Sequence, residues 1–294
     1  MLRVNTSASF AGTDSGIFAH TATRDVVSLM YHDVIKERPE ESGYLVPGSA
    51  QYKLTVEQFR AHLVAISALT AHEPLVVAGL RPSAELGTES TRGSIGPFTL
   101  TFDDGGSSAH SIIAPLLEEF GWRGHFFVAT EHLGTDGFIT TDQAVDLHAR
   151  GHVIGSHSHT HPDRFSALDP AIQVDEWRTS RLKLTELLGH EVVVASVPNG
   201  YYTPAVARAA AEAGIRLLFT SEPTSRSHQV AGCLVAGRFS IQRTTTSASV
   251  AALIGTNPLY RLKQGYAWGV KKAMKRVGGE FYLKARDSIL RRTD

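Results

Sequence analysis

Residues Phe98 to Gly105 read Phe-Thr-Leu-Thr-Phe-Asp-Asp-Gly. The five residues before the carboxylates predict a short buried strand, and Gly105 and Gly106 then turn the chain. Adjacent strand residues point to opposite faces, so Asp103 and Asp104 would not share one task. A plain Asp-Gly turn after a strand is the simpler interpretation. Unpaired carboxylates beside an apolar strand are costly, however, which favours one of them binding a metal and the other handling protons.

A second stretch, His157-Ser158-His159-Thr160-His161, follows an apolar run that also predicts a strand end. Each buried imidazole needs polar partners, so three histidines within five residues are seldom a core feature. Neutral imidazole is a good zinc ligand, and one carboxylate with two histidines makes a typical three-ligand catalytic site. The pattern therefore favours metal binding by Asp104 and two of these histidines over a chance cluster.

Both stretches resemble motifs of the metal-dependent polysaccharide deacetylases, carbohydrate esterase family four. Thr101 to Gly105 matches the family's Thr-Phe-Asp-Asp-Gly, and His157 to His161 matches its His-Ser/Thr-x-x-His. The resemblance extends from about Asp25 to about Arg243. It implies that Asp103 is the catalytic base and that Asp104, His157 and His161 bind a divalent metal, most simply Zn²⁺. His159 falls on a variable position.

The later motifs depart from the family pattern. The family's third motif begins with an Arg that holds the catalytic Asp, and Ser196 occupies that position here. Pro198, Asn199, Gly200 and Tyr201 follow, and the resemblance implies that this segment binds substrate and donates a backbone amide to an oxyanion. The orientation of Asp103 is thereby left open. The fourth motif, an Asp with Trp, has only Thr220-Ser221-Glu222-Pro223 as a counterpart.

The fifth family motif, Leu-x-His, supplies the general acid, but residues 237–243 contain no histidine. A leaving amine needs a proton donor within hydrogen-bond reach. His32 follows the predicted first strand, where polar side chains of a β/α barrel face the active site, and is our candidate for the acid. A histidine bonded only to a neighbouring loop is the alternative. His228, in a predicted polar loop, is a weaker candidate.

Apolar strand patterns alternate with amphipathic helical patterns from Val26 to Ile241. Such alternation implies parallel β/α units, and about seven can be counted. The fold class is therefore α/β, and the resemblance implies a distorted, incomplete (β/α)7 barrel of the polysaccharide deacetylase type. We expect a loose extension at 1–23, the barrel at 24–256, and a basic helical tail at 257–294.

Composition narrows the function further. The 294 residues are 42% hydrophobic with zero net charge, which gives no overall field for nucleic acid. Cys233 is the single cysteine, as expected in a reducing compartment. Residues 1–20 lack a secretory pattern and no stretch suits a bilayer, so a cytoplasmic location is expected.

The tail has a different character. Residues 259–294 contain ten Lys or Arg, three Asp or Glu, and interleaved aromatic residues such as Trp268. This local charge of +7 suits either a solvated helix pair packed on the barrel or peripheral contact with an anionic membrane.

Together these features predict a metal-dependent hydrolase that removes an N-acyl group, most simply acetyl, from an amino sugar of a polysaccharide or lipid-linked glycan. Two alternatives remain open at this point. One is hydrolysis of a non-sugar cyclic amide on the same fold. The other is a non-catalytic glycan-binding module, which the missing Arg and His favour and the intact base and metal ligands oppose.

Overall fold

The computed structural model describes residues 25–46, 48–77, 96–255 and 259–265. Their main feature is a curved sheet of nine strands in the order β11-β1-β4-β5-β6-β7-β8-β10-β9. All neighbours pair in parallel except β9 and β10, which are antiparallel. The strands are β1 (Val27–Tyr31), β4 (Phe98–Phe102), β5 (His125–Val128), β6 (Val153–Ser156), β7 (Val194–Ser196), β8 (Leu217–Phe219), β9 (Ser227–Val230), β10 (Cys233–Ala236) and β11 (Phe239–Ser240).

The two ends of this sheet meet through a single bent segment. β10 pairs with β8 near one edge, whereas β11 pairs with β1 at the other, yet only Gly237 and Arg238 separate them. A sheet joined in this way must curl until its ends approach each other. Gly237 lies so close to Glu222 and Thr224 that a Cβ atom would clash with them. The described strands thus form an incomplete barrel, with seven parallel strands if β10 and β11 are counted as one broken strand.

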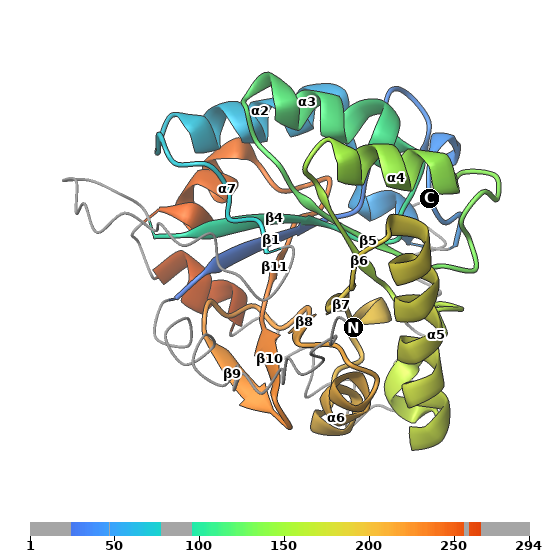
Figure 1. Cartoon of the computed structure of the whole chain (residues 1–294). Helices are drawn as coiled ribbons and strands as arrows, with labels where there is room; N and C mark the ends of the chain where they lie inside the picture. Colours follow the sequence, from blue (N-terminus) through green and yellow to red (C-terminus); the bar gives the residue numbers. More distant parts are fainter. Residues whose placement is uncertain (1–24, 47, 78–95, 256–258, 266–294) are drawn as a thin grey trace, which may run out of the picture.

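Helices cover the outside of the curved sheet, with α2, α3 and α4 on one side and α5 and α6 on another (Figure 1). Their bounds are α2 (Val56–Ser67), α3 (Ala114–Glu119), α4 (Thr141–Ala149), α5 (Pro170–Leu188), α6 (Pro204–Glu212) and α7 (Ser247–Ile254). A π-helix, Ala109–Ile113, leads into α3. Thr55 is the N-cap of α2, because its side chain accepts a hydrogen bond from the Gln58 N–H at 3.2 Å.

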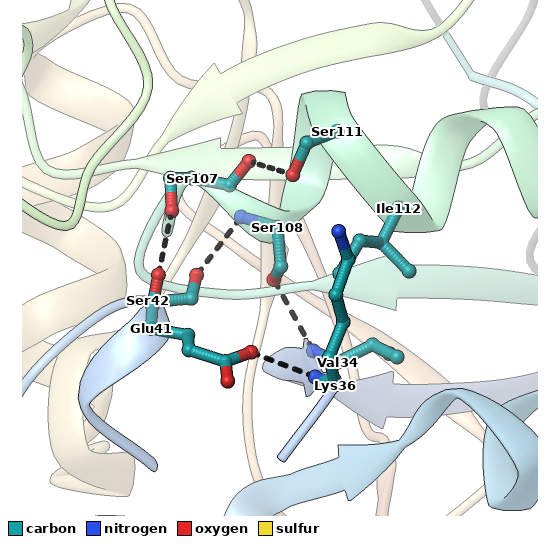
Figure 2. A pocket seen from close by; sticks show the side chains of 8 residues that line it. All are labelled: Val34, Lys36, Glu41, Ser42, Ser107, Ser108, Ser111 and Ile112. Atoms are coloured by element: carbon teal, nitrogen blue, oxygen red, sulfur yellow. Dashed lines mark hydrogen bonds between the residues drawn. The ribbon is translucent and has the colours of Figure 1, made fainter. Parts of the chain in front are cut away.

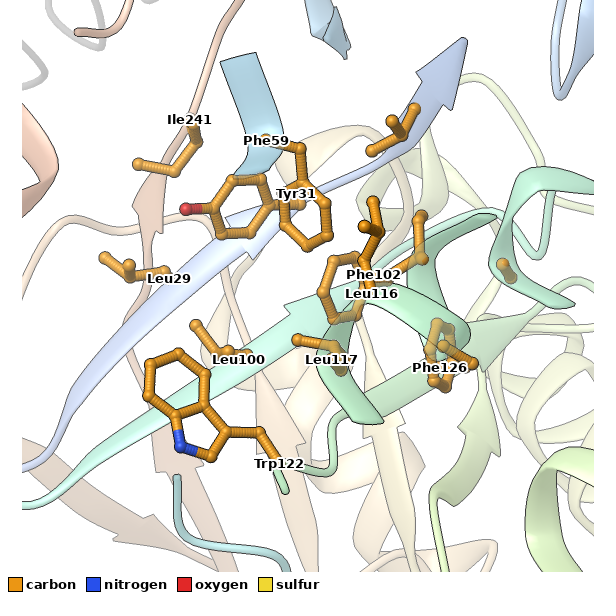
Figure 3. Packing of buried hydrophobic residues seen from close by; sticks show 14 of the residues in the cluster. Leu29, Tyr31, Phe59, Leu100, Phe102, Leu116, Leu117, Trp122, Phe126 and Ile241 are labelled. Carbon is orange, nitrogen blue, oxygen red and sulfur yellow. The ribbon is translucent and has the colours of Figure 1, made fainter. Parts of the chain in front are cut away.

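The largest apolar core lies between the strands and helices α2, α3, α4 and α7. Aromatic rings form its centre: Phe102 stacks on Tyr31 at 5.5 Å and on Phe126 at 5.0 Å, and Phe59 meets it edge-on (Figure 3). Phe102 directly precedes Asp103, so this packing fixes the strand end from which the two carboxylates project.

Two short local features were not predicted, and one prediction needs correction. The chain after His32 forms a second, two-stranded parallel sheet of β2 (Asp33–Ile35) and β3 (Lys53–Thr55), which the pattern did not indicate because each strand has three residues. The irregular segment that follows β2 contains a short 3-10 helix, Pro39–Glu41, which the pattern also did not indicate. His228 lies on β9, not in a loop. β9 is a half-exposed hairpin strand whose polar sequence concealed it.

Other predictions fall on parts of the chain outside the described residues. They are the extension at 1–23 and most of the tail at 257–294. Within the described ranges, no helix combines the length and apolar character needed to cross a bilayer.

Candidate active site

The predicted site residues gather at one edge of the sheet because they follow the carboxyl ends of neighbouring strands. Tyr31 at the end of β1 pairs with Phe102 at the end of β4, which puts His32 and Asp103 at the same level. Ser156 at the end of β6 pairs with Ala195 of β7, so His157 and Ser196 also share a level. In β/α barrels this edge is the one that carries active sites.

Asp104, His157 and His161 form a compact cluster, with ligand atoms that all lie within 4.8 Å of one another. Asp104 Oδ1 is 3.3 Å from His157 Nε2 and 3.4 Å from His161 Nε2. Burial alone would raise the pKa of Asp104, but hydrogen bonds from the two histidines hold it well below its usual value. A carboxylate oxygen and two imidazole nitrogens in this arrangement fit a divalent metal such as Zn²⁺.

Backbone conformation separates the two adjacent carboxylates. Asp104 has φ of 76° and Gly105 has φ of 79°, so the chain leaves the extended conformation at Asp104. Asp is one of the few residue types that tolerate this left-handed region. Asp103 consequently stays in line with β4 and faces the barrel interior, whereas Asp104 turns towards the histidines. This geometry explains how neighbouring residues can take different tasks.

His157 is oriented by the strand beside it. Its Nδ1 lies 3.0 Å from the backbone carbonyl oxygen of Ser196. Because a carbonyl only accepts, Nδ1 carries the hydrogen and donates it, so in the neutral imidazole the Nε2 lone pair would be available to a metal ion. This is the arrangement that metal-binding histidines usually show.

Asp103 is held by an arginine that the sequence motifs did not reveal. Arg238 Nη1 donates to Asp103 Oδ1 at 2.7 Å, and Nη2 donates to Oδ2 at 2.8 Å. The Arg238 side chain is fully buried and the Asp103 side chain is 4% exposed. The rings of Phe127 and Phe219 flank the guanidinium at 5.7 and 5.8 Å. A bidentate pair of this kind fixes both the position and the plane of the carboxylate.

Ser196 completes the contact. Its hydroxyl donates to Asp103 Oδ2 at 3.1 Å and accepts from Arg238 Nη2 at 2.6 Å. The orientation of Asp103 could not be predicted from the sequence, because Ser196 occupies the position of the arginine that holds this carboxylate in the family. In the structure, an arginine from the segment between β10 and β11 reaches the same carboxylate. The signal in the sequence was Arg238, a basic residue that lies within the otherwise apolar strand pattern of residues 233–241.

Arg238 also controls the charge of Asp103. Burial would raise the pKa of this carboxyl, but the guanidinium of Arg238 and the nearby imidazole of His157 lower it below its usual value. His157 responds in the opposite sense. Burial lowers its pKa, and the carboxylates of Asp103 and Asp104 outweigh burial and raise it. Asp103 is therefore ionised at neutral pH, as a proton acceptor must be.

The two histidines considered as candidates for the general acid, His32 and His228, have different surroundings. His32 lies near the carboxylates, since its charge contributes to lowering the pKa of Asp103 and of Asp104, and its ring packs on Tyr52 at 4.6 Å. Its Nδ1 is buried and has no hydrogen-bond partner among the described residues. His228 is exposed, and its Nε2 contacts the Tyr202 hydroxyl at 3.2 Å.

The segment of Pro198, Asn199, Gly200 and Tyr201 follows β7 as a short turn. Asn199 adopts φ of 54°, and its side-chain amide is 3.5 Å from the carbonyl oxygen of Pro162, the residue after His161. The turn therefore adjoins the loop that carries the histidines. The Tyr201 N–H makes a long bond of 3.4 Å to the Pro198 carbonyl.

Comparison with known proteins agrees with this geometry. The sequence profile of the family described as Polysaccharide deacetylase matches residues 92–218, which include the Asp-Asp and His-x-x-x-His motifs. Residues 92–218 belong to the polysaccharide deacetylase family.

Two curated relatives share this family likeness. The chain is 34% identical over 92 residues to a chitin deacetylase of Pestalotiopsis sp, which covers 31% of this chain and 30% of the relative. The chain is also 26% identical over 128 residues to YxkH of Bacillus subtilis (strain 168), which is named a putative polysaccharide deacetylase. That alignment covers 44% of this chain and 46% of YxkH. These matches span less than half of either relative.

A solved structure of the deacetylase PplD of Streptococcus pyogenes, in complex with acetate, superposes with a TM-score of 0.64. It is 20% identical in sequence and covers 78% of this chain and 97% of its own. At this identity the likeness establishes the fold, which is the polysaccharide deacetylase type of barrel.

We expect Arg238→Met to destabilise the protein by about 3–5 kcal/mol at pH 8, because it leaves a buried carboxylate without its cation. The pKa of Asp103 is depressed in the folded parent, so the pair contributes stability above the usual carboxyl range and loses it as pH falls. The parent loses this contribution only below the usual carboxyl range. In Arg238→Met, burial is no longer offset by the guanidinium and raises the pKa of Asp103, so the variant is relieved as the carboxyl takes up a proton and the penalty should shrink as pH falls from 8 towards 5 in urea unfolding. Combining it with Asp103→Asn should cost less than the sum of the single changes. Additive costs that do not vary with pH would contradict the coupling.

Proposed function

We propose that this chain is a metal-dependent hydrolase that removes an N-acyl group, most simply acetyl, from an amino sugar of a polysaccharide or lipid-linked glycan. One observation carries the proposal. A buried carboxylate that Arg238 keeps ionised directly precedes a carboxylate that clusters with two histidines. Amide hydrolysis needs these two functions side by side, a proton acceptor for water and a group that activates the carbonyl.

Asp103 is the proposed base. It accepts a proton from the attacking water as the water oxygen bonds to the acyl carbon. Arg238 and Ser196 hold the carboxylate so that it cannot rotate away from the cluster. The C–N bond then breaks, and the products are a free amine on the sugar and a carboxylic acid.

His32 is the proposed acid that gives a proton to the leaving nitrogen. Two observations support it: its level beside Asp103 across the β1–β4 pairing, and its buried Nδ1 with no partner among the described residues. The segment from Pro198 to Tyr201 is the proposed substrate contact, in which the Tyr201 N–H would exchange its long bond for one to the oxyanion.

Asp104, His157 and His161 are the proposed ligands of a divalent metal, with Zn²⁺ the best match to the nitrogen and oxygen donors. A metal bound there would supply a Lewis acid for the acyl carbonyl.

The non-catalytic alternative loses part of its basis. A glycan-binding module was favoured by a missing arginine and a missing histidine. Arg238 occupies the role of the first, and a binding module would have no need of a fully buried cation on Asp103. No feature of the described residues favours a cyclic amide over an acetylated sugar as substrate.

A lipid-linked substrate remains a proposal that depends on the basic tail. Its described beginning, residues 259–265, is helical, and Arg261 donates to the Leu253 carbonyl at 2.8 Å. Leu259 and Leu262 are each 65% exposed, three residues apart. The remaining tail residues, 266–294, lie outside the described part. Contact of residues 259–294 with an anionic membrane, at a cytoplasmic face, would bring the site to such a substrate.

We expect Asp103→Asn to retain bound metal and to release acetate from N-acetylhexosamine oligomers about 10²–10⁴ times more slowly, because proton transfer is lost while the ligands remain. His157→Ala should lose metal and activity together. Metal content and acetate release are measured on the same folded preparations. An Asp103→Asn rate within about tenfold of the parent would mean that water is activated elsewhere.

We also expect the protein to sediment with vesicles of anionic lipid at low salt and to be released as salt rises, since exposed charges are screened over about 8 Å at physiological ionic strength. Reversal of Lys271, Lys272, Lys275 and Arg276 to Glu should abolish sedimentation and leave turnover of soluble substrate unchanged. A parent protein that stays in the supernatant at low salt would rule out membrane contact and favour a soluble sugar.

A further inference from the structure

The two histidines of the cluster are held differently. His157 donates a hydrogen bond to the Ser196 carbonyl, whereas the ring of His161 has no such bond to the described residues. Its recorded ring contacts in that part of the chain are with Asp104 at 3.4 Å, with His157 at 5.0 Å, and with the ring of Tyr44. Metal-binding histidines usually need a second contact that fixes the ring. The ring of His161 must therefore be fixed by a contact other than a hydrogen bond.

Tyr44 provides that contact. Its ring stacks on the His161 ring with centroids 4.6 Å apart and planes inclined by 28°. Tyr44 is itself packed edge-on against His132 at 5.1 Å and Phe138 at 4.9 Å, which stack on each other. The stack leaves His161 little freedom to rotate about its side-chain bonds.

The loop that carries Tyr44, residues 37–46, is fastened by a buried lysine. Lys53 is 2% exposed, and its ammonium donates to the carbonyl oxygens of Pro39 at 2.7 Å, Ser42 at 2.6 Å and Tyr44 at 2.8 Å. Burial of an ammonium is costly, and these three bonds compensate for the water it has lost. The backbone at Tyr44 is therefore fixed by the protein interior, although it belongs to a loop.

A second anchor joins the same loop to the turn that follows Asp104. The buried carboxylate of Asp33 accepts from the Ser42 hydroxyl at 2.5 Å and from the Ser108 hydroxyl at 2.8 Å. Gly106 approaches this carboxylate so closely that a Cβ atom would clash with it. Ser42 and Ser108 also line a small hollow in which every serine hydroxyl is bonded to the protein (Figure 2). The hydrogen bonds around this hollow thus connect the loop at 37–46 to the turn that follows Asp104.

Glu176 of α5 holds the backbone on the other side of His161. Its Oε2 accepts from the N–H groups of His159 and Thr160, each at 2.9 Å, and its Oε1 accepts from the Thr160 hydroxyl at 2.7 Å. The Glu176 residue as a whole is 9% exposed. His161 has φ of 54°, a conformation that a histidine adopts only when its surroundings impose it. Three bonds to the two preceding residues supply that constraint.

We propose that Tyr44 and Glu176 are positioning residues for His161, and that the affinity of the cluster for its metal depends on both. The inference rests on the proposed function to the extent that Asp104, His157 and His161 bind a metal. Neither residue belongs to the family motifs quoted above. Tyr44 fixes the ring from a loop over 50 residues before the first motif, and Glu176 fixes the backbone from the following helix.

The test uses two matched pairs of variants and the dissociation constant for Zn²⁺, measured by competition with a chromophoric chelator. Tyr44→Leu removes the stack, whereas Tyr44→Phe keeps the ring and loses only the hydroxyl. Glu176→Met leaves two backbone N–H groups unpaired, whereas Glu176→Gln retains a carbonyl oxygen that can accept from both of them and an amide group that can donate to the Thr160 hydroxyl oxygen. We expect Tyr44→Leu and Glu176→Met to weaken Zn²⁺ binding by about 10–100-fold, and the conservative variants to stay within about threefold of the parent.

Thermal unfolding of the metal-free proteins separates this effect from loss of the fold, and the constants are measured well below the lowest transition. If Tyr44→Leu does not fold, Tyr44→Met takes its place. Zn²⁺ affinities of Tyr44→Leu and Glu176→Met equal to those of their conservative partners would overturn the inference while leaving the metal site intact. A parent protein that binds no Zn²⁺ or other divalent metal would instead overturn the proposed function, and the inference with it.

Discussion

The bidentate pair between Arg238 and Asp103 is the constraint on which the rest of the site depends. Both groups are removed from water, so each is costly to bury unless the other is in place. The pair can form only if the end of β4 and the segment between β10 and β11 meet inside the barrel. Those elements are over 130 residues apart in sequence. The segment that joins the two ends of the sheet therefore also supplies the residue that orients Asp103.

The segment between β10 and β11 therefore has a different role here from the one that the family resemblance implies. The family resemblance implies a general acid from that segment, and here the segment carries Arg238, the cation that holds Asp103, the proposed base. Arg238 fills the interior beside Phe127 and Phe219, so a proton donor must approach from another side. In the proposed mechanism that side is the end of β1, where His32 follows a strand paired directly with β4. The carboxylates and histidines of the proposed base and metal ligands thus stay in place, while the residues that support them come from different strands.

Much of the fold could be predicted from the sequence because its signals are local. The apolar run before Asp103, the capping residue Thr55 and the glycines after helices each act within a few residues, and the alternation of strands and helices follows from them. The family likeness was also local, since two short motifs carry it. Short strands such as β2, β3 and β9 escaped prediction because three or four residues show no clear period.

The supporting contacts of the site could not be predicted for a different reason. Arg238, Tyr44 and Glu176 reach the motif residues only through tertiary packing, and no spacing along the chain relates them to Asp103 or His161. Lys53 illustrates the difficulty, because a lysine at a strand start is normally assigned to the surface. Its three carbonyl partners lie in a loop that the sequence presents as irregular.

The most direct test of this account is the pH dependence of acetate release, as kcat/KM, for the parent protein and for Arg238→Met, each loaded with metal to the same occupancy. Arg238 lowers the pKa of Asp103, so its removal must raise that pKa. The account predicts that the acidic limb of the profile moves to higher pH by about one to three units and that the rate at neutral pH falls. An unchanged acidic limb together with an unchanged neutral rate would contradict it.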